Sequence, residues 1–292
     1  MVTLDLSLTS LLAVAVLGAI SSVFILKLIS PILISSFQDS RELKDPAILK
    51  IIQERLDHAG LPLLRVDRWS EGPRKSANAM VVGLIGVPRF FRARILLSES
   101  VINDFNRNEL DAILAHEISH FRLNHLSKRV WTPFIIYLSI IFSGVMGLAP
   151  FVSSTRLAVF LTIVIVAIAY ILSFSILLRH LVRSQELDAD WMAVHHFGIN
   201  LDLYLNTLDK MSKYNDRATK VDSQSSHPTN SERKENLLRE VGLKSPPHEK
   251  RFIKQVGTST ATAMILIFLS SVLISSLRPT PSRQPAAAQK SR

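Results

Sequence analysis

The chain has 292 residues, with 34 Lys and Arg against 24 Asp and Glu, and its mean hydropathy of +0.25 is high for a soluble protein. It contains no cysteine, which excludes disulfides, a thiolate nucleophile and cysteine-based structural zinc sites. No recognised nucleic-acid-binding module accompanies the net charge of +10, so we expect anionic lipid rather than nucleic acid beside the basic loops.

Four apolar segments interrupt the chain, and each is about as long as a bilayer-spanning helix requires. The segment at 6–26 lacks a basic start and a clear cleavage site, which favours an uncleaved anchor over a signal peptide. The segments at 131–155 and 157–178, separated by Arg156, predict a transmembrane hairpin, and a last span is expected over 255–277. The hairpin returns the chain to the side that it left, so the polar parts before and after it can meet.

The chain is therefore predicted to alternate between membrane parts and polar parts. These are an N-terminal anchor (1–36), a first polar part (37–130), the hairpin (131–181), a second polar part (182–254), a transmembrane helix (255–277) and a disordered tail (278–292). Lys and Arg are concentrated in the two polar parts, and the positive-inside rule places such loops in the cytoplasm. We expect a multi-pass protein of the plasma or inner membrane whose polar parts face the cytoplasm.

The first polar part predicts a small α+β domain. An amphipathic helix is expected over 42–58, followed by short strands over 63–69, 80–84 and 95–97 that Gly and Pro separate. An edge strand in such a sheet can bind a peptide through main-chain hydrogen bonds, with little demand on the identity of its side chains.

The next helix carries the sequence HEISH at residues 116–120. His116 and His120 are four residues apart, about 40° round a helix, so both imidazoles can bind one metal ion from the same face. Glu117 lies about 100° round from His116, where it can reach a water molecule at the metal without being a ligand. This is the HExxH pattern of zinc peptidases, although the motif alone leaves open a chance occurrence on an amphipathic helix.

Other residues define how this helix begins, packs and ends. Asn108 is predicted to cap it, with Asp111 in its first turn. One apolar stripe predicts the face that packs on the core: Leu110, Ile113, Leu114, Ile118 and Phe121. His125 is nine residues beyond His116, about 180° round a continuous helix, and is interpreted as a cation at the helix end rather than a ligand.

The second polar part supplies a third metal ligand. Glu186 and Asp190 share one helix face, so Glu186 can complete a His, His, Glu site while Asp190 accepts a hydrogen bond from a ligating imidazole. Arg183, three residues before Glu186, is expected to hold a carboxylate in place. Without the upstream motif the same residues would indicate an ordinary solvated helix. Two further helices are predicted over 201–214 and 232–241, joined by a polar loop.

Four stretches together resemble the membrane-embedded gluzincin peptidases of the HtpX and CAAX-prenyl-protease type. They are HEISH, Glu186-Leu187-Asp188-Ala189-Asp190, Asn78-Ala79-Met80-Val81-Val82-Gly83 and His227-Pro228-Thr229-Asn230-Ser231-Glu232-Arg233. Their order and approximate spacing match those of the family. HtpX-type members usually carry two membrane helices before the HExxH motif, whereas one is predicted here, which leaves the subfamily and the substrate open.

The resemblance implies roles for individual residues. It implies that one Zn²⁺ is bound by His116, His120 and Glu186 and that Glu117 is the catalytic base. It further implies that Asn78 lies on or beside an edge strand that holds an extended substrate. His227 is implied to lie in a loop close to the metal, where it stabilises the oxyanion or gates the site.

The sequence thus predicts an α+β gluzincin catalytic domain, an HExxH helix with a small sheet, interleaved with about four transmembrane helices. We expect a zinc metalloendopeptidase that hydrolyses misfolded or membrane-associated proteins at the lipid bilayer. A processing protease for specific tails, such as prenylated ones, is the second hypothesis, and an inactive membrane adaptor is the third. Ligand type alone does not separate zinc from cobalt or manganese.

Overall fold

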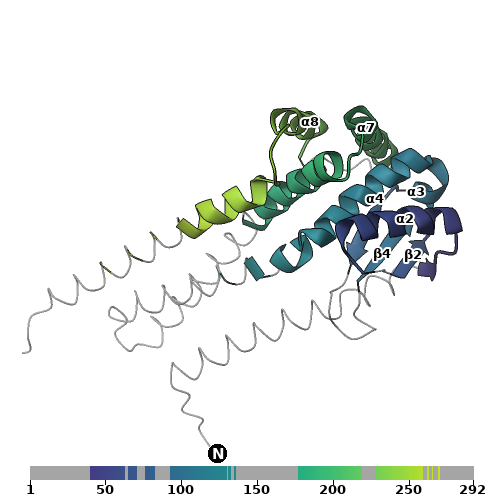
Figure 1. The fold of residues 1–292 in the computed structure, drawn as a ribbon, viewed down its shortest axis with the longest axis horizontal. Coiled ribbons are helices and arrows are strands. Elements are labelled where there is room, and N and C mark those ends of the chain that lie inside the picture. The colour runs from purple at the N-terminus through teal and green to yellow at the C-terminus, as the bar shows by residue number, and fades with distance from the viewer. Residues whose placement is uncertain are drawn as a thin grey trace, which may run out of the picture. The chain divides into compact units, whose positions relative to one another are not determined.

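The computed structural model describes residues 40–62, 65–70, 76–82, 93–129, 131, 132, 135, 177–218, 228–258, 262, 265 and 269. The chain divides into two compact units, Met1–Ile135 with Phe174–Gln255 and Ile136–Ser173 with Val256–Arg292. All the helices and strands labelled in Figure 1 belong to the first unit.

Within the part of the chain that the structure describes, no helix combines the length and the apolar composition needed to cross a membrane. Most residues of the four predicted membrane segments lie outside the described ranges, as does the predicted tail at 278–292.

The described strands form one mixed sheet in the order β1-β2-β4-β3. β2 (Arg65–Trp69) runs parallel to β4 (Arg94–Ser98). β1 (Ser40–Glu42) and β3 (Ala79–Val82) pair antiparallel with them and occupy the two edges. β4 is paired on both sides, and Ile95 is fully buried in it, as an apolar central strand requires. The predicted α+β class with a small sheet is therefore confirmed.

α2 (Pro46–Ala59) begins later than the predicted helix over 42–58. The Asp45 side chain accepts the backbone N–H groups of the first turn, at 2.9 and 3.3 Å, and a proline at the first helical position fixes this start. Glu42, the first residue of the predicted helix, instead ends β1. The helix ends at Gly60, whose φ of 65° is a left-handed conformation that favours glycine.

α4 (Arg107–Arg122) carries the HEISH sequence and follows the short helix α3 (Glu99–Asp104), which was not predicted. The prediction that Asn108 caps α4 is wrong. Asn106 is the cap, because Glu109 reaches back to its backbone N–H at 2.8 Å and completes a capping box. Asp111 instead binds the Arg55 guanidinium of α2 through two hydrogen bonds of 2.6 and 2.5 Å.

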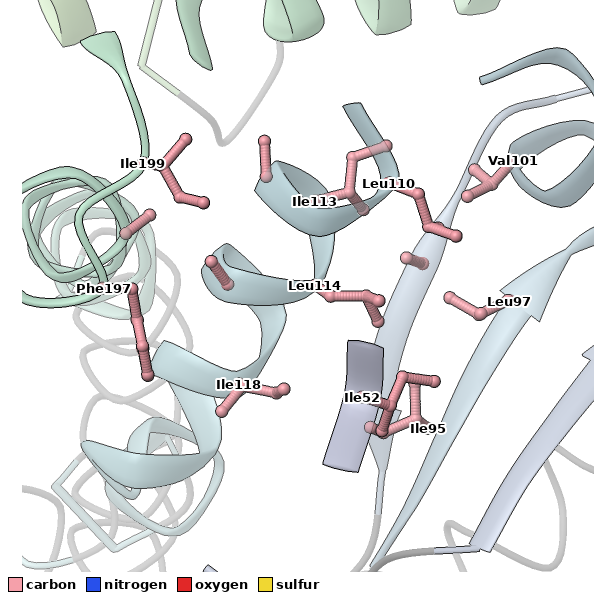
Figure 2. Close-up of a cluster of buried hydrophobic side chains, with 14 of the residues drawn as sticks. Ile52, Ile95, Leu97, Val101, Leu110, Ile113, Leu114, Ile118, Phe197 and Ile199 are labelled. Atoms are coloured by element: carbon pink, nitrogen blue, oxygen red, sulfur yellow. The ribbon is translucent and has the colours of Figure 1, made fainter. Parts of the chain in front are cut away.

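The predicted apolar stripe of α4 is confirmed as the face that packs on the core. Figure 2 shows Leu114 of α4 pointing toward Ile95 and Leu97 of β4 and Ile52 of α2. All four side chains are fully buried, and each such burial stabilises the fold by about 1.5–3 kcal/mol. The opposite face of α4 is thereby directed toward the second polar part.

The second polar part is helical over most of its described length. A helix covers 177–191 and continues into a wider π-helical turn, η2 (Met192–His196), after which Phe197 and Ile199 pack near α4 (Figure 2). α7 (Leu201–Ala218) packs against both α4 and α8 (Asn230–Arg239). A last described helix begins near 248.

Candidate metal centre

α4 presents two imidazoles to a carboxylate from the helix at 177–191. Nε2 of His116 lies 3.1 Å from Nε2 of His120. Oε2 of Glu186 lies 3.4 Å from the first of these nitrogens, and Oε1 lies 3.3 Å from the second. His116 and Glu186 are buried and His120 is half-buried. Folding therefore brings together the three residues that the sequence predicts as metal ligands.

The distances between these donor atoms suit a metal ion. A tetrahedral Zn²⁺ with N and O ligands at about 2.0–2.2 Å separates neighbouring ligand atoms by about 3.3–3.6 Å. The two imidazole nitrogens are 3.1 Å apart, and each lies 3.3–3.4 Å from one of the two Glu186 oxygens. One ligand atom from each residue lies within 4.8 Å of the other two. Two imidazole lone pairs that face each other this closely repel unless a cation or a proton lies between them. The donor set therefore fits Zn²⁺, and three protein ligands leave a fourth position open.

Glu117 follows His116 on α4 and is half-buried. Consecutive helical residues lie about 100° apart, so Glu117 begins at the edge of the ligand face rather than on it. That position suits a base for a water molecule beside the metal, as the HExxH pattern predicts.

The second ring nitrogen of His116 is held by a buried polar network. Its Nδ1 lies 2.9 Å from the Tyr204 hydroxyl and 3.1 Å from Oδ1 of Asp190. Tyr204 in turn donates to Asp190 at 2.6 Å, and Nε of Arg233 donates to the other carboxylate oxygen at 2.6 Å. Asp190 is thus an acceptor behind His116, one of the imidazoles that the sequence predicts as ligands.

Charges in this network decide which groups are ionised. Burial alone would raise the pKa of Asp190, but the Arg233 guanidinium outweighs it and lowers that pKa to about 2. Burial, with Asp190 nearby, raises the pKa of the Tyr204 phenol well above 10 and keeps it a neutral donor. Burial also opposes a charge on His116, yet hydrogen bonds to Asp190 and Glu186 raise its pKa to about 9 when no metal competes.

The surroundings of His120 differ from those of His116. Burial lowers the pKa of His120 to about 4, although Glu186 is adjacent. Arg129 donates to Oε1 of Glu186 at 3.0 Å and to Oε1 of Gln185 at 2.7 Å. Arg129, which follows α4 in the first polar part, thus holds the predicted third ligand.

The interpretation of His125 as a cation at the helix end is wrong. It is 1% exposed, burial lowers its pKa, and its Nδ1 lies 2.8 Å from Nδ1 of His120. The sequence argument assumed that α4 continues past Arg122. The helix in fact ends there, and Asn124 takes a φ of 57° that turns the chain. The next helical turn begins at His125 on the side of the metal centre.

The outcome differs among three other residues that the sequence predicts for this centre. Arg183 does hold a carboxylate, but that carboxylate is Glu232 of α8, while Arg129 takes the place beside Glu186. Asn78 directly precedes the edge strand β3, and its backbone exchanges hydrogen bonds with Ser98 at 2.9 and 3.0 Å. His227 lies outside the described residues.

Sequence reasoning missed several residues of the network. Arg233 lies inside the stretch 227–233 that carried the family resemblance, and this stretch was the signal that could have identified it. Tyr204 and Arg129 left no such signal, since an amphipathic helix and a basic helix end explain them without a site. Tyr204 is nonetheless 1% exposed and touches both His116 and Asp190.

Comparisons with known proteins agree with this geometry. The chain is 33% identical over 95 residues to CAAX prenyl protease 1 of Saccharomyces cerevisiae, which is 32% of this chain but only 20% of that relative. Its fold is similar to the crystal structure of S. mikatae Ste24p, with a TM-score of 0.58 and 22% sequence identity over 78% of this chain and 58% of that one. The model of peptidase family M48 matches residues 42–241, more than half of the chain. The chain therefore belongs to peptidase family M48, and its resemblance to the HtpX and CAAX-prenyl-protease type is confirmed.

Proposed function

We propose that this protein is a membrane-bound zinc metalloendopeptidase that hydrolyses peptide bonds of misfolded or membrane-associated proteins. The observation that carries the proposal is the convergence of His116, His120 and Glu186, with donor atoms 3.1–3.4 Å apart. These three residues would hold one Zn²⁺. When bound, the ion would polarise the scissile carbonyl and lower the pKa of a water molecule at its open position.

The protein groups divide the remaining work. Glu117 would take the proton of the attacking water and pass it to the leaving amine. Asp190 and Tyr204, at 3.1 and 2.9 Å from Nδ1 of His116, would keep the proton on that nitrogen, so that Nε2 offers its lone pair to the metal. His227 would donate to the oxyanion. The contact between Arg233 and Asp190 supports this role, because it ties the helix that follows His227 to the metal centre.

The edge strand β3 is the proposed binding site for an extended substrate. Among the described strands it pairs only with β4, and it packs beside α4. A peptide that adds to its free edge would run alongside the helix that carries the ligands. Asn78, exposed at the start of β3, would contact such a peptide. Binding at a strand edge depends on the peptide backbone more than on its side chains, which suits a protease of broad specificity.

A processing protease for prenylated tails is the second candidate. The 33% identity to CAAX prenyl protease 1 over 95 residues favours it. The aligned region covers a fifth of that relative, however, so the substrate of the relative is not carried over with it. Cleavage of a prenylated peptide at least as fast as of unfolded casein would favour this candidate over the broad one.

Metal content and cleavage test the proposal together. We expect detergent-purified wild type to hold about one zinc per chain, as a catalytic zinc site does, and Glu186→Ala to lose it. Glu117→Gln should keep the zinc but lose casein cleavage, whereas Glu54→Gln, which removes an exposed carboxylate of α2, should keep both. A wild type without metal, or full cleavage by Glu117→Gln, would contradict the proposal and favour the inactive adaptor.

We also propose that the catalytic domain faces the cytoplasm from the plasma or inner membrane, on the strength of its basic polar parts. The absence of cysteine makes a direct test simple. A single Lys50→Cys substitution places one thiol on the exposed surface of α2. That thiol should resist a membrane-impermeant reagent in intact cells and react after lysis. Labelling in intact cells would reverse the proposed orientation.

A further inference from the structure

His125 is deeply buried beside one of the proposed zinc ligands, and the proposed mechanism does not use it. Its Nδ1 lies 2.8 Å from Nδ1 of His120. Its Nε2 is buried without a hydrogen-bond partner, 3.9 Å from Oε2 of Glu249. The turn at Asn124 creates this contact, since it ends α4 and returns the chain to the ligand face.

The contact between the two rings restricts where their protons lie. Ring nitrogens 2.8 Å apart must share one hydrogen, with one ring donating and the other accepting. If Nε2 of His120 offers its lone pair to a metal, the proton of that ring lies on Nδ1 and is donated to His125. His125 then carries its own proton on Nε2, which faces Glu249.

Glu249 is built to receive that proton as a hydrogen-bond acceptor. Glu249 is 4% exposed, and its carboxylate accepts hydrogen bonds from Lys128 at 2.5 Å and from Gln185 at 2.7 Å. Gln185 is oriented for this contact, because Arg129 occupies its amide oxygen at 2.7 Å. A shift of less than 1 Å would bring Glu249 within hydrogen-bond reach of His125.

We propose that His125, backed by Glu249, is the positioning residue that fixes the tautomer and orientation of His120 for metal binding. The inference rests on the proposed zinc site. It gives each imidazole ligand its own acceptor, Asp190 for His116 and His125 for His120. Such partners behind a ligating histidine raise its affinity for the metal by holding one ring orientation.

The alternative for the same residues is a second metal site. Ligand atoms of His125, Asp188 and Glu249 lie within 4.8 Å of one another. A metal on Nε2 of His125 would, however, move the ring proton to Nδ1, and His120 would then have to accept it and lose its own ligand lone pair. Asp188 is also occupied, since its two oxygens accept backbone N–H groups at 2.8 and 2.9 Å. Hydrogen bonding from His120 to His125 and from His125 toward Glu249 is therefore the arrangement that allows a metal at His120.

Two matched amide variants separate the two contacts of His125. In His125→Asn the amide oxygen replaces Nδ1 and can still accept from His120, so most of the zinc affinity should remain. In His125→Gln the amide lies where Nε2 was, so the acceptor for His120 is lost. Zinc affinity, measured by competition with a chromogenic chelator, should fall about 10- to 100-fold for this variant. Equal affinity of both variants and wild type would overturn the role while leaving the zinc site intact.

A second measurement needs no substitution of His125 or Glu249. Histidine ¹⁵N correlation spectra of the zinc-loaded wild type should show a proton on Nδ1 of His120 and on Nε2 of His125. The opposite placement on His125 would overturn the inference.

The free energy of unfolding of the metal-free proteins separates positioning from a merely structural role. If His125 acts by positioning His120, the metal-free His125→Gln and His125→Asn variants should have the same unfolding free energy and differ only in zinc affinity. A wild type that holds no zinc would overturn the proposed function and this inference together. If Glu186→Ala loses zinc while His125→Gln keeps the zinc affinity of wild type, the inference alone is overturned.

Discussion

The two faces of α4 are stabilised in different ways. The face toward the sheet is apolar, and Leu114 is fully buried there against Ile95 and Leu97. The opposite face places His116 in a buried network with Tyr204, Asp190 and Arg233, which come from distant parts of the chain. Apolar packing depends on shape and tolerates small shifts, whereas the polar face depends on each partner being present. Substitutions on the sheet face should therefore change stability alone, whereas those on the polar face should change both stability and metal binding.

The largest effect is expected from breaking the buried ion pair on the metal face. Asp190→Asn leaves Arg233 as an uncompensated buried charge, which should lower the free energy of unfolding by about 3–5 kcal/mol. Chemical denaturation in detergent measures this. The double variant Asp190→Asn with Arg233→Met should recover much of the loss, since the unpaired charge is gone. A double variant as unstable as the single one would contradict the assignment.

The pKa of Asp190 gives the same pair a pH dependence. Its value of about 2 in the folded chain lies below the ordinary 3.8, so its contribution to stability is present above about pH 4 and is lost as the pH falls toward 2. Wild type should lose more stability over this range than the double variant does.

The next effect should come from the sheet face. Leu114→Ala removes a fully buried side chain and should cost about 2–5 kcal/mol of unfolding free energy, because a cavity remains between α4 and β4. Zinc content at temperatures below unfolding should be unchanged. If Leu114→Ala loses zinc while still folded, the two faces are coupled and the separation proposed above is wrong.

Tyr204→Phe tests the polar face without changing its volume. The phenol donates to Asp190 at 2.6 Å, and its loss should destabilise the fold by about 1–3 kcal/mol. It should also weaken zinc binding, unlike Leu114→Ala. Comparing the two variants by chelator competition at equal fractions folded shows which face controls the metal.

The smallest effect is expected at the start of α4, away from both faces. Asn106→Ala removes the side-chain cap of the helix and should cost about 0.5–2 kcal/mol. Asn108→Ala is the matched control, because Asn108 has no capping role, and it should have little effect. Equal losses from the two variants would restore Asn108 as the cap.

The periodicity of apolar residues predicted the helices and strands that have one buried face. The strands expected over 63–69, 80–84 and 95–97 correspond to β2, β3 and β4, and the stripe of α4 is its core face. The three-residue β1 and the six-residue α3 were too short to leave a periodic signal. The cap of α4 was misplaced because two asparagines lie near its start, and only contact with Glu109 distinguishes them.

The sequence by itself determined which residues share a helix face, and so it paired His116 with His120 and Glu186 with Asp190, because helical spacing is a local property. It could not determine what lies across from those faces. The packing of α7, which brings Tyr204 to His116, arises only when separate segments meet in three dimensions. The turn at Asn124, which moves His125 beside His120, breaks the regular helical spacing on which the prediction for His125 rested. The residues that converge at the candidate metal centre were therefore predictable, whereas the residues that contact their rings were decided by the tertiary structure.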